Sequence, residues 1–274
     1  NKGVDYDRIP QIDLDLTPGK VWNLLIKEKN IKILRKIGSK QNLGIISKIN
    51  RGLITGDRSK YFATSKISEK YIPILTGSDV GRYYSNAPIE YVLFEKPKSA
   101  GGCWDSDVHL AKHKICIRQI GFQPTASLIT EPYAITGNLF SVITENLDFN
   151  KYLLSIINSK AVKYYWQIMF NDFKTSFPQV TLFNLSNIPI PKATSKQEKL
   201  LSDFSAKMLS LNTDLISHSK KFQRSIQRKF NLEDLPKSLQ EWYLNTYSDF
   251  IKELAKNKIK LSLAEEAEWE EFFG

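Results

Sequence analysis

The stretch LSNIPIPKATSKQEKLL, residues 185–201, divides the chain into two parts of different character. Pro189 and Pro191 keep the backbone extended and remove two hydrogen-bond donors, so a helix does not continue through them. Ser195, with Glu198 three residues later, matches a capping box and predicts the start of a helix. The sequence therefore predicts a mixed region before this stretch and a helical region after it.

The region after the prolines has an apolar residue every three, four or seven positions. These residues are Leu200, Phe204, Met208, Leu211, Leu215, Phe222, Ile226 and Phe230. The spacing places them on one side of a long helix over residues 195–230. Beyond Pro236 we expect a second helix over residues 238–256. Ser262 and Glu265 form another capping box, which predicts a short third helix that folds back on the long one.

The region before the prolines consists of short apolar runs interrupted by Gly, Pro and Asn, a pattern typical of strands and turns. We expect strands at 12–16, 43–49, 71–75, 91–94, 114–120, 133–136 and 139–143, and helices at 22–37, 149–157 and 159–169. Asp148 and Ser159 are the expected caps of the last two helices. The predicted fold class is α+β, with a lead-in segment (1–42), a mixed-sheet α/β domain (43–192) and a helical arm (193–274).

The composition favours an anionic partner. The 274 residues carry a formal net charge of +10, and 42% are hydrophobic, enough for a substantial core. A basic excess favours nucleic acid first and an anionic membrane second, with a solvated lysine-rich surface as the alternative. No apolar run approaches the roughly 20 residues of a membrane span, so we expect no membrane partner.

The cysteine content and the first residue of the sequence lead to two further expectations. Two cysteines, Cys103 and Cys116, are too few for a disulfide framework and fit a reducing compartment, so we expect a cytoplasmic protein. The sequence does not begin with Met, and we expect it to be a fragment of a longer protein, a processed product or a separate subunit.

Motifs of common active sites are missing from the sequence. It has neither a phosphate-cradling glycine-rich loop before a helix nor a serine in a nucleophile-elbow pattern. A zinc site is one alternative, with Cys103, His109, His113 and Cys116 as candidate ligands. Their spacing does not match a standard zinc pattern, and Cys116 lies in an apolar run where a buried thiol is common. We therefore expect no metal site.

A magnesium-dependent nuclease is a further alternative. Such an enzyme needs clustered carboxylates with a nearby lysine. The only loose candidates are Glu95, Asp105 and Asp107 with Lys96. Ordinary surface carboxylates explain these residues more simply.

Basic and amide side chains lie in or beside the turns and strand ends of residues 43–192. Arginine can hydrogen-bond guanine edges, amides can do the same for adenine, and lysine mainly contacts phosphates. We predict DNA contacts by Arg51, Arg58, Lys60, Arg82, Lys112, Lys114, Arg118, Gln119 and Lys174. The best candidates are Arg58, Arg82 and Arg118, with Lys60 and Lys174 on phosphate. The position of Arg118 within a strand leaves an internal ion pair open.

Several motifs in a fixed order resemble a known family. They are GLITG (52–56) with Phe62, ILTGSDVGRY (74–83), KICIR (114–118), YLLSIINSK (152–160) and IPIP (188–191). Together they resemble the TaqI-like C-terminal specificity domain, the target-recognition module of bacterial adenine-N6 DNA methyltransferases, including fused restriction–modification enzymes. The resemblance implies an α/β domain that reads duplex DNA, followed by helices like the spacer of type I specificity subunits. The tail, residues 250–273, resembles the C-terminal end of such fused enzymes.

The sequence departs from these enzymes in one respect. Their methyltransferase half carries a glycine-rich cofactor motif and an Asn-Pro-Pro-Tyr catalytic motif, and neither occurs here. We therefore expect no S-adenosylmethionine site and no methyl transfer in this chain, with that cofactor held by a missing methyltransferase half. The expected partners are double-stranded DNA and a methyltransferase or nuclease portion of the same chain or of another subunit. The alternative function is a helical assembly subunit of a restriction–modification complex.

Overall fold

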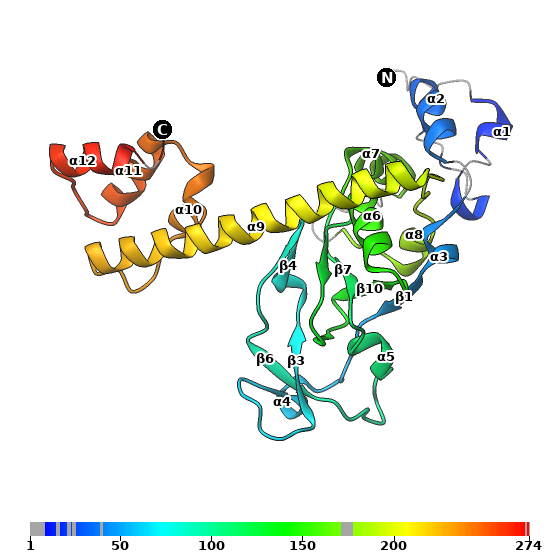
Figure 1. Ribbon diagram of the computed structural model, residues 1–274, viewed down its shortest axis with the longest axis horizontal. Helices are drawn as coiled ribbons and strands as arrows, with labels where there is room; N and C mark the ends of the chain where they lie inside the picture. The colour runs from blue at the N-terminus through cyan, green and yellow to red at the C-terminus, as the bar shows by residue number, and fades with distance from the viewer. Residues whose placement is uncertain are drawn as a thin grey trace, which may run out of the picture. The chain divides into compact units, whose positions relative to one another are not determined.

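The computed structural model describes residues 9–14, 17–20, 23, 26–38, 41–170, 178–271 and 273. The chain separates into two units, Asn1–Leu209 and Ser210–Gly274. Helices and strands mix in the first unit, whereas the described elements of the second are all helical (Figure 1). The predicted α+β class is therefore confirmed, while the three predicted segments, 1–42, 43–192 and 193–274, remain predictions.

One four-stranded antiparallel sheet forms the centre of the first unit. Its strand order is β1 (Lys48–Arg51), β10 (Leu139–Ile143), β7 (Lys114–Arg118) and β8 (Ala126–Ile129). The inner strands β7 and β10 are almost wholly buried, which agrees with their mainly apolar sequences. The main core of the unit packs against this sheet, with Ile115, Ile117 and Val142 from the strands.

A second, mixed four-stranded sheet lies in the same unit. Its order is β2 (Phe62–Ala63), β6 (Glu90–Leu93), β3 (Tyr71–Leu75) and β9 (Ala134–Ile135), and only β3 and β9 are parallel. A smaller core of Leu53, Ile74, Val92 and Ala134 belongs to it. Next to the sheets, β4 (Val80–Gly81) and β5 (Tyr84–Ser85) form a hairpin.

The chain passes from one sheet to the other at two adjacent segments. Strand β9 of the second sheet is separated from β10 of the first only by residues 136–138. Residues 52–54 run beside this segment, because Leu53 N donates to Ile135 O (2.9 Å) and Gly137 N donates to Leu53 O (2.8 Å). A side chain at Gly52 would place its Cβ 2.2 Å from the Thr136 carbonyl oxygen, so the close approach requires glycine. We call residues 52–54 and 136–138 the crossing segments.

Helices cover the first sheet. They are α6 (Leu147–Ile157), α7 (Lys160–Met169), α8 (Leu182–Ser186) and α3 (Leu43–Ile46), and α6 supplies Tyr152, Leu153, Leu154 and Ile157 to the main core. Before them come α1 (Gln11–Leu14), a 3₁₀ turn at Pro18–Lys20 and α2 (Glu28–Ile37). The remaining short helices of the unit are α4 (Arg58–Tyr61), a 3₁₀ turn at Gly77–Asp79 and α5 (Ser106–His109).

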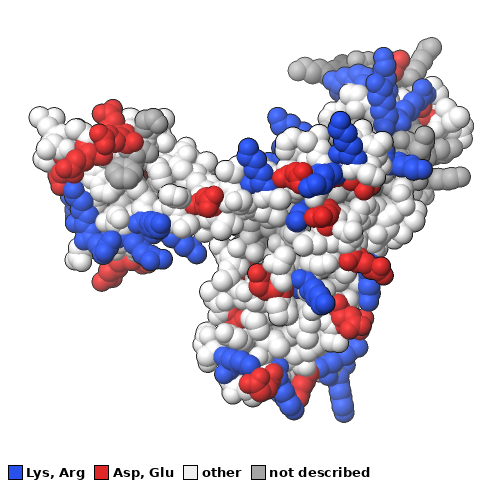
Figure 2. Space-filling model, in the orientation of Figure 1, with Lys and Arg blue, Asp and Glu red and all other residues white. Residues whose placement is uncertain are grey.

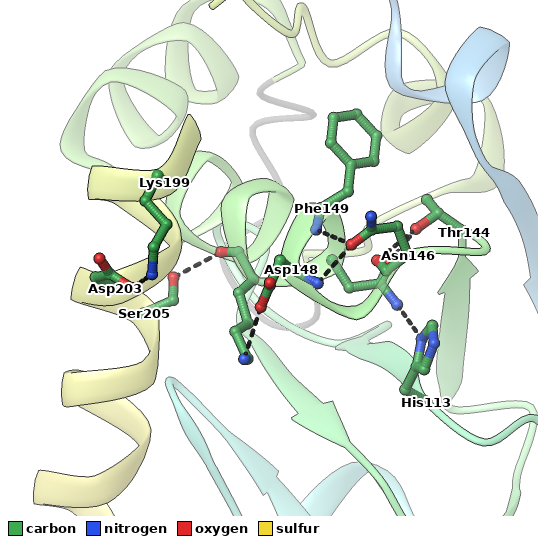
Figure 3. A network of polar contacts seen from close by, with 10 residues as sticks. His113, Thr144, Asn146, Asp148, Phe149, Lys199, Asp203 and Ser205 are labelled. Atoms are coloured by element: carbon green, nitrogen blue, oxygen red, sulfur yellow. Dashed lines mark hydrogen bonds and ion pairs between the residues drawn. The ribbon is translucent and has the colours of Figure 1, made fainter. Parts of the chain in front are cut away.

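Polar side chains tie α6 to its surroundings (Figure 3). Asn150, which is fully buried, accepts a hydrogen bond from Thr144 Oγ1 (2.8 Å), and its Nδ2 lies 2.8 Å from His113 Nδ1. Ser205 of α9 donates to Lys151 O (2.7 Å), and Lys151 pairs with Asp148. Helix α6 is therefore connected both to the ends of β7 and β10 and to the first turns of α9.

Helix α9 (Ser195–Phe230) has 36 residues and contributes to both units. The rest of the second unit contains α10 (Lys237–Gln240), a 3₁₀ turn at Trp242–Leu244, α11 (Tyr247–Lys256) and α12 (Leu263–Glu270). Its core is aromatic: the Phe222 ring lies 4.2 Å from Trp242 and 5.4 Å from Trp269, centroid to centroid. Trp269 belongs to α12, so the predicted fold-back of this helix onto the long one is confirmed.

The structure corrects two strand predictions. Residues 12–16 were expected to alternate as a strand, but Gln11–Leu14 is helical, and Asp13, only 3% exposed, pairs with Arg35 (2.6 Å) instead of pointing to solvent. The expected strand 43–49 begins only at Lys48. Before it, α3 buries Leu43, whose N–H donates to Ile188 O (2.9 Å), a partner remote in sequence.

The structure also corrects three helix predictions, two at an N-terminus and one within the expected helix. Helix α9 is capped by Thr194 and Gln197 rather than by Ser195 and Glu198. Asn146, not Asp148, caps α6, since its side chain accepts from two backbone N–H groups. The expected helix 238–256 is interrupted at Asn245, whose side chain donates to Ser238 O, and the next residue caps α11. The cap at Ser159 and the capping box at Ser262 and Glu265 are confirmed.

Among the described helices, none has both the length and the apolar character that crossing a membrane requires.

Candidate nucleic-acid interface

A cleft of about 880 Å³ lies in the first unit between residues of the two sheets. Its lining includes the ends of β1 and β7, the crossing segments, and parts of β2, β3 and β6. Three arginines, Arg51, Arg58 and Arg118, line it together with the carboxylates Asp79 and Glu90. On the face seen in Figure 2, Lys and Arg are interspersed with Asp and Glu on the first unit, so no single basic patch dominates this face.

Strand pairing brings two of the arginines together. Arg51 ends β1 and Arg118 ends β7, and both strands pair with β10. Opposite them in the register are Phe140, for Arg51, and Leu139, for Arg118, which are consecutive residues of β10. Two arginines far apart in sequence thus flank the same end of one central strand.

Hydrogen bonds hold the Arg51 side chain against the wall of the cleft. Its Nε donates to Gly137 O at 2.8 Å, and its Nη2 donates to Gln119 Oε1 at 3.3 Å. The predicted residues Arg51 and Gln119 therefore contact each other. Because Gly137 belongs to a crossing segment, Arg51 also connects β1 to the junction of the two sheets.

Arg58 comes from the opposite side, on the short helix α4. Asp57 caps this helix, and hydrogen bonds from the Ser59 hydroxyl and the Lys60 backbone lower the pKa of its carboxyl group. The Arg58 guanidinium forms an ion pair with Glu90 of β6 and lies 4.1 Å from the centre of the Phe62 ring. Its charge is therefore partly neutralised, and one of its faces is covered.

Arg118 differs from the other two. Its Nε is shielded from solvent, and within the described residues this atom has no hydrogen-bond partner. An enclosed donor without a partner costs roughly 1–3 kcal/mol. Thr136, which is 7% exposed, also lines the cleft. Its hydroxyl oxygen is enclosed and lacks a partner in the described part of the chain. Two unsatisfied polar groups in one cleft are typical of a site that binds a polar ligand.

Comparison with known proteins places most of this cleft in a recognised domain. Residues 72–190 match the family model of the TaqI-like C-terminal specificity domain. Residues 72–190 form a TaqI-like specificity domain. The resemblance noted in the sequence is thereby confirmed. Arg118, Thr136 and the turn at residues 76–79 fall within the specificity domain, whereas Arg51 and Arg58 precede the matched residues.

Other comparisons extend beyond the specificity domain. Residues 194–274 match a domain of unknown function, DUF8810. No curated protein matches the chain. One similar solved chain comes from a study of complex assembly and conformational transition of the type I restriction–modification system. The two chains share 14% sequence identity with a TM-score of 0.40, and the match covers 69% of this chain and 42% of that chain. Another is the HsdS subunit from Thermoanaerobacter tengcongensis, with 11% identity and a TM-score of 0.39 over 73% and 41%. This chain thus spans about two fifths of the length of either.

Three further predicted contact residues that the structure describes, Lys60, Arg82 and Lys112, do not line the cleft. Arg82 donates to Asn158 O (2.9 Å) beside Tyr83, and Lys60 lies on α4 with its ammonium 5.9 Å from the Tyr61 ring centre. Lys112 is exposed on the loop before β7. Lys174 lies outside the described residues.

Among the predicted contacts within the described residues, Lys114 alone has a fully buried side chain. Its ammonium donates to His109 O at 2.7 Å, and burial lowers its pKa. A buried ammonium group does not reach a ligand in the cleft, so we leave Lys114 out of the DNA-contacting set.

The specificity domain also lines the cleft with residues that the sequence prediction missed. They are Thr76, Ser78, Asp79, Thr136 and Asn138. Residues 76–79 were interpreted only as a turn, and Asp79 indeed closes that turn by accepting from Thr76 N and Thr76 Oγ1, both at 2.7 Å. The position of this turn directly after β3, like that of Asn138 directly before β10, was the available signal.

The alternative sites do not assemble in the described part of the chain. Both ring nitrogens of His109 are bonded to backbone, with Nε2 2.9 Å from Cys103 O and Nδ1 accepting from Ile135 N (3.2 Å). Burial raises the pKa of the Cys116 thiol to about 12, which opposes metal binding by this thiol. Glu95 pairs with Lys70 at the surface. Across the described residues, no three His, Cys, Asp or Glu side chains are grouped to hold a metal ion.

Proposed function

We propose that the cleft binds duplex DNA and that the chain supplies sequence specificity to a restriction–modification enzyme. The observation that carries the proposal is the convergence of Arg51, Arg58 and Arg118 on one cleft that lies largely in a specificity domain. Arginines at separate strand ends suit a ligand that offers both phosphates and base edges.

The charges of the cleft support this assignment. Its lining carries three arginines against two carboxylates, Asp79 and Glu90, which leaves a formal charge of +1. Asp79 is engaged within its own turn and Glu90 with Arg58. DNA phosphates would displace counterions from the arginines, so binding should weaken as salt rises.

The finer function follows from the motifs. We propose that the intact enzyme methylates adenine N6, that the target adenine is flipped into a methyltransferase half beyond this chain, and that S-adenosylmethionine binds there. The supports are the ordered motifs and the lack of an Asn-Pro-Pro-Tyr motif in residues 1–274. Such an enzyme would work in the cytoplasm, with its methyltransferase or nuclease portion as partner.

Selection from a pool of random duplexes tests the proposal. The purified chain should enrich a short motif at roughly 0.15 M salt, where nonspecific phosphate binding is weakened. The double variant Arg51→Gln, Arg58→Gln should lose affinity for the enriched duplex. The matched control Lys163→Gln removes an exposed charge of α7, outside the cleft, and should bind like the wild type. Failure of the wild type to bind any duplex would contradict the proposal and favour the assembly function.

A further inference from the structure

We infer that Arg118 reads a guanine base in the bound DNA and that Arg51 and Arg58 contact the DNA backbone. This division of roles rests on the proposed function and specifies the base pair that the cleft selects.

Arg51 has little freedom to read a base. Its Nε and Nη2 both donate to protein acceptors, Gly137 O and Gln119 Oε1. Bidentate reading of guanine requires two parallel N–H groups from one edge of the guanidinium. Two of the five N–H donors of Arg51 are thus committed to protein acceptors, which hold the guanidinium in place while its positive charge stays available for a phosphate.

Arg58 is committed in a different way. Glu90 occupies part of its donor edge, and the Phe62 ring lies 4.1 Å from its central carbon. Its side chain is about half exposed at the rim of the cleft. A phosphate can approach such a rim charge from solvent, so Arg58 suits the DNA backbone.

Arg118 has its donors available. Within the described ranges its side chain has no ion pair and no hydrogen bond, and its Nε is enclosed by protein. The enclosed Nε leaves the two Nη groups for a ligand, and these form the end-on fork that matches guanine O6 and N7. Glu90 is paired with Arg58 and Asp79 is hydrogen-bonded within its own turn, so neither carboxylate forms an ion pair with Arg118.

The backbone of Arg118 is fixed, as base reading requires. Arg118 pairs with Leu139 in the ladder, and its N–H donates to Thr125 O at 3.0 Å. A site on a paired strand positions its side chain more accurately than a loop does.

Position-resolved selection with the full chain tests the inference. The wild-type motif should contain one G·C pair preferred by about 5- to 150-fold. Arg118→Gln should reduce the preference at that position to near onefold while the other positions keep theirs. Arg118→Lys keeps the charge but not the fork, so it should retain nonspecific affinity and lose the preference.

A matched control is available in the same cleft. Arg58→Gln also removes one charge, and it should lower affinity for all duplexes alike and leave the motif unchanged. Thermal unfolding midpoints near that of the wild type would show that each variant is folded. An unchanged motif in both Arg118 variants would overturn base reading by Arg118 while leaving the proposed function intact. A wild type that enriches no motif would overturn both.

Discussion

At the scale of single residues, a buried pair shows how a basic side chain can serve the fold. The Lys114 ammonium donates to the carbonyl oxygen of His109, and the His109 ring bonds to the backbone of Cys103 and Ile135. These contacts attach the segment around α5 to β7 and β9. The sequence predicted a DNA contact at Lys114 because it lies at a strand end, but its burial depends on residues remote in sequence.

Replacing His109 should remove part of the acid sensitivity of the protein. Burial lowers its pKa below the usual 6.5, so below pH 6.5 the unfolded chain binds a proton that the folded chain does not. This contribution to stability is present above pH 6.5 and is lost as the pH falls toward the lowered pKa. His109→Gln should cost about 1–3 kcal/mol near neutral pH through lost hydrogen bonds and should flatten the acid slope. Urea unfolding at about pH 7.5 and about pH 5.5 measures both effects.

The exposed residue His218 provides the control. His218→Gln should leave the stability and its pH dependence as in the wild type. Equal acid slopes for the wild type and His109→Gln would contradict a buried neutral His109.

Burial of Lys114 should change the stability of the protein at alkaline pH. Because burial lowers its pKa from 10.5, the unfolded chain binds more protons between the lowered value and 10.5, and stability rises with pH in that window. Lys114→Met should abolish this rise and leave stability near neutral pH equal or higher, since a buried charge is replaced by an apolar chain of similar size. Denaturant unfolding across this range, with exposed Lys112→Met as the control, measures the difference. A rise that persists in Lys114→Met would refute the assignment.

At the scale of elements, Asn158 joins a helix to an edge strand. It follows α6, and its side chain accepts from Ala126 N (3.1 Å) and donates to Ala126 O (3.0 Å), as a neighbouring strand would. Its own carbonyl oxygen accepts from Arg82. Asn158 therefore joins three elements, the hairpin, β8 and the end of α6.

Removing this amide should destabilise the first unit. Asn158→Leu leaves the buried Ala126 N–H without its acceptor, whereas Ala126 O keeps the hydrogen bond from Tyr83 N (2.9 Å), so the change should cost roughly 1–3 kcal/mol. Asn158→Asp keeps the acceptor but not the donor, so its cost should be smaller at neutral pH. Denaturant unfolding compares both with Gln167→Leu, an amide replacement at an exposed position of α7. A loss for Asn158→Leu no larger than for Gln167→Leu would show that the strand-like pairing contributes little.

The elements also show which patterns a sequence reveals. Local signals explain three correct predictions. The strand 139–143 is mainly apolar, and at Ser159 and Ser262 the capping side chain accepts a hydrogen bond from within its own turn. Two capping boxes overlap in the sequence before α9, and no local rule chooses Thr194 over Ser195. The arginines of the cleft were found by residue type. Their division of roles depends on Gly137, Glu90 and β10, which no local pattern connects.

At the scale of the whole molecule, the two units have separate cores, and the cleft residues all belong to the first. Phe222 is central to the second core, where it contacts the rings of Trp242, Phe250 and Trp269. Damage to that core should therefore leave DNA selection by the first unit unchanged.

Phe222→Ala tests this independence. The loss of a buried aromatic ring should cost the second unit about 3–5 kcal/mol. Near-ultraviolet circular dichroism should report a loss of packing around Trp242 and Trp269, while duplex selection should return the wild-type motif. A changed motif in a variant whose first unit remains folded would show that the second unit takes part in reading DNA.

The order of the cleft residues and the scaffold helices along the chain affects how such a protein can change in evolution. Every described residue that lines the cleft falls between Arg51 and Asn138, whereas α6, α7 and α8, which complete the main core, come later in the chain. One continuous stretch of gene thus encodes the whole lining, and the scaffold helices are encoded outside it. A single recombination event that replaces this stretch would exchange one recognition surface for another and keep the helical scaffold of the recipient.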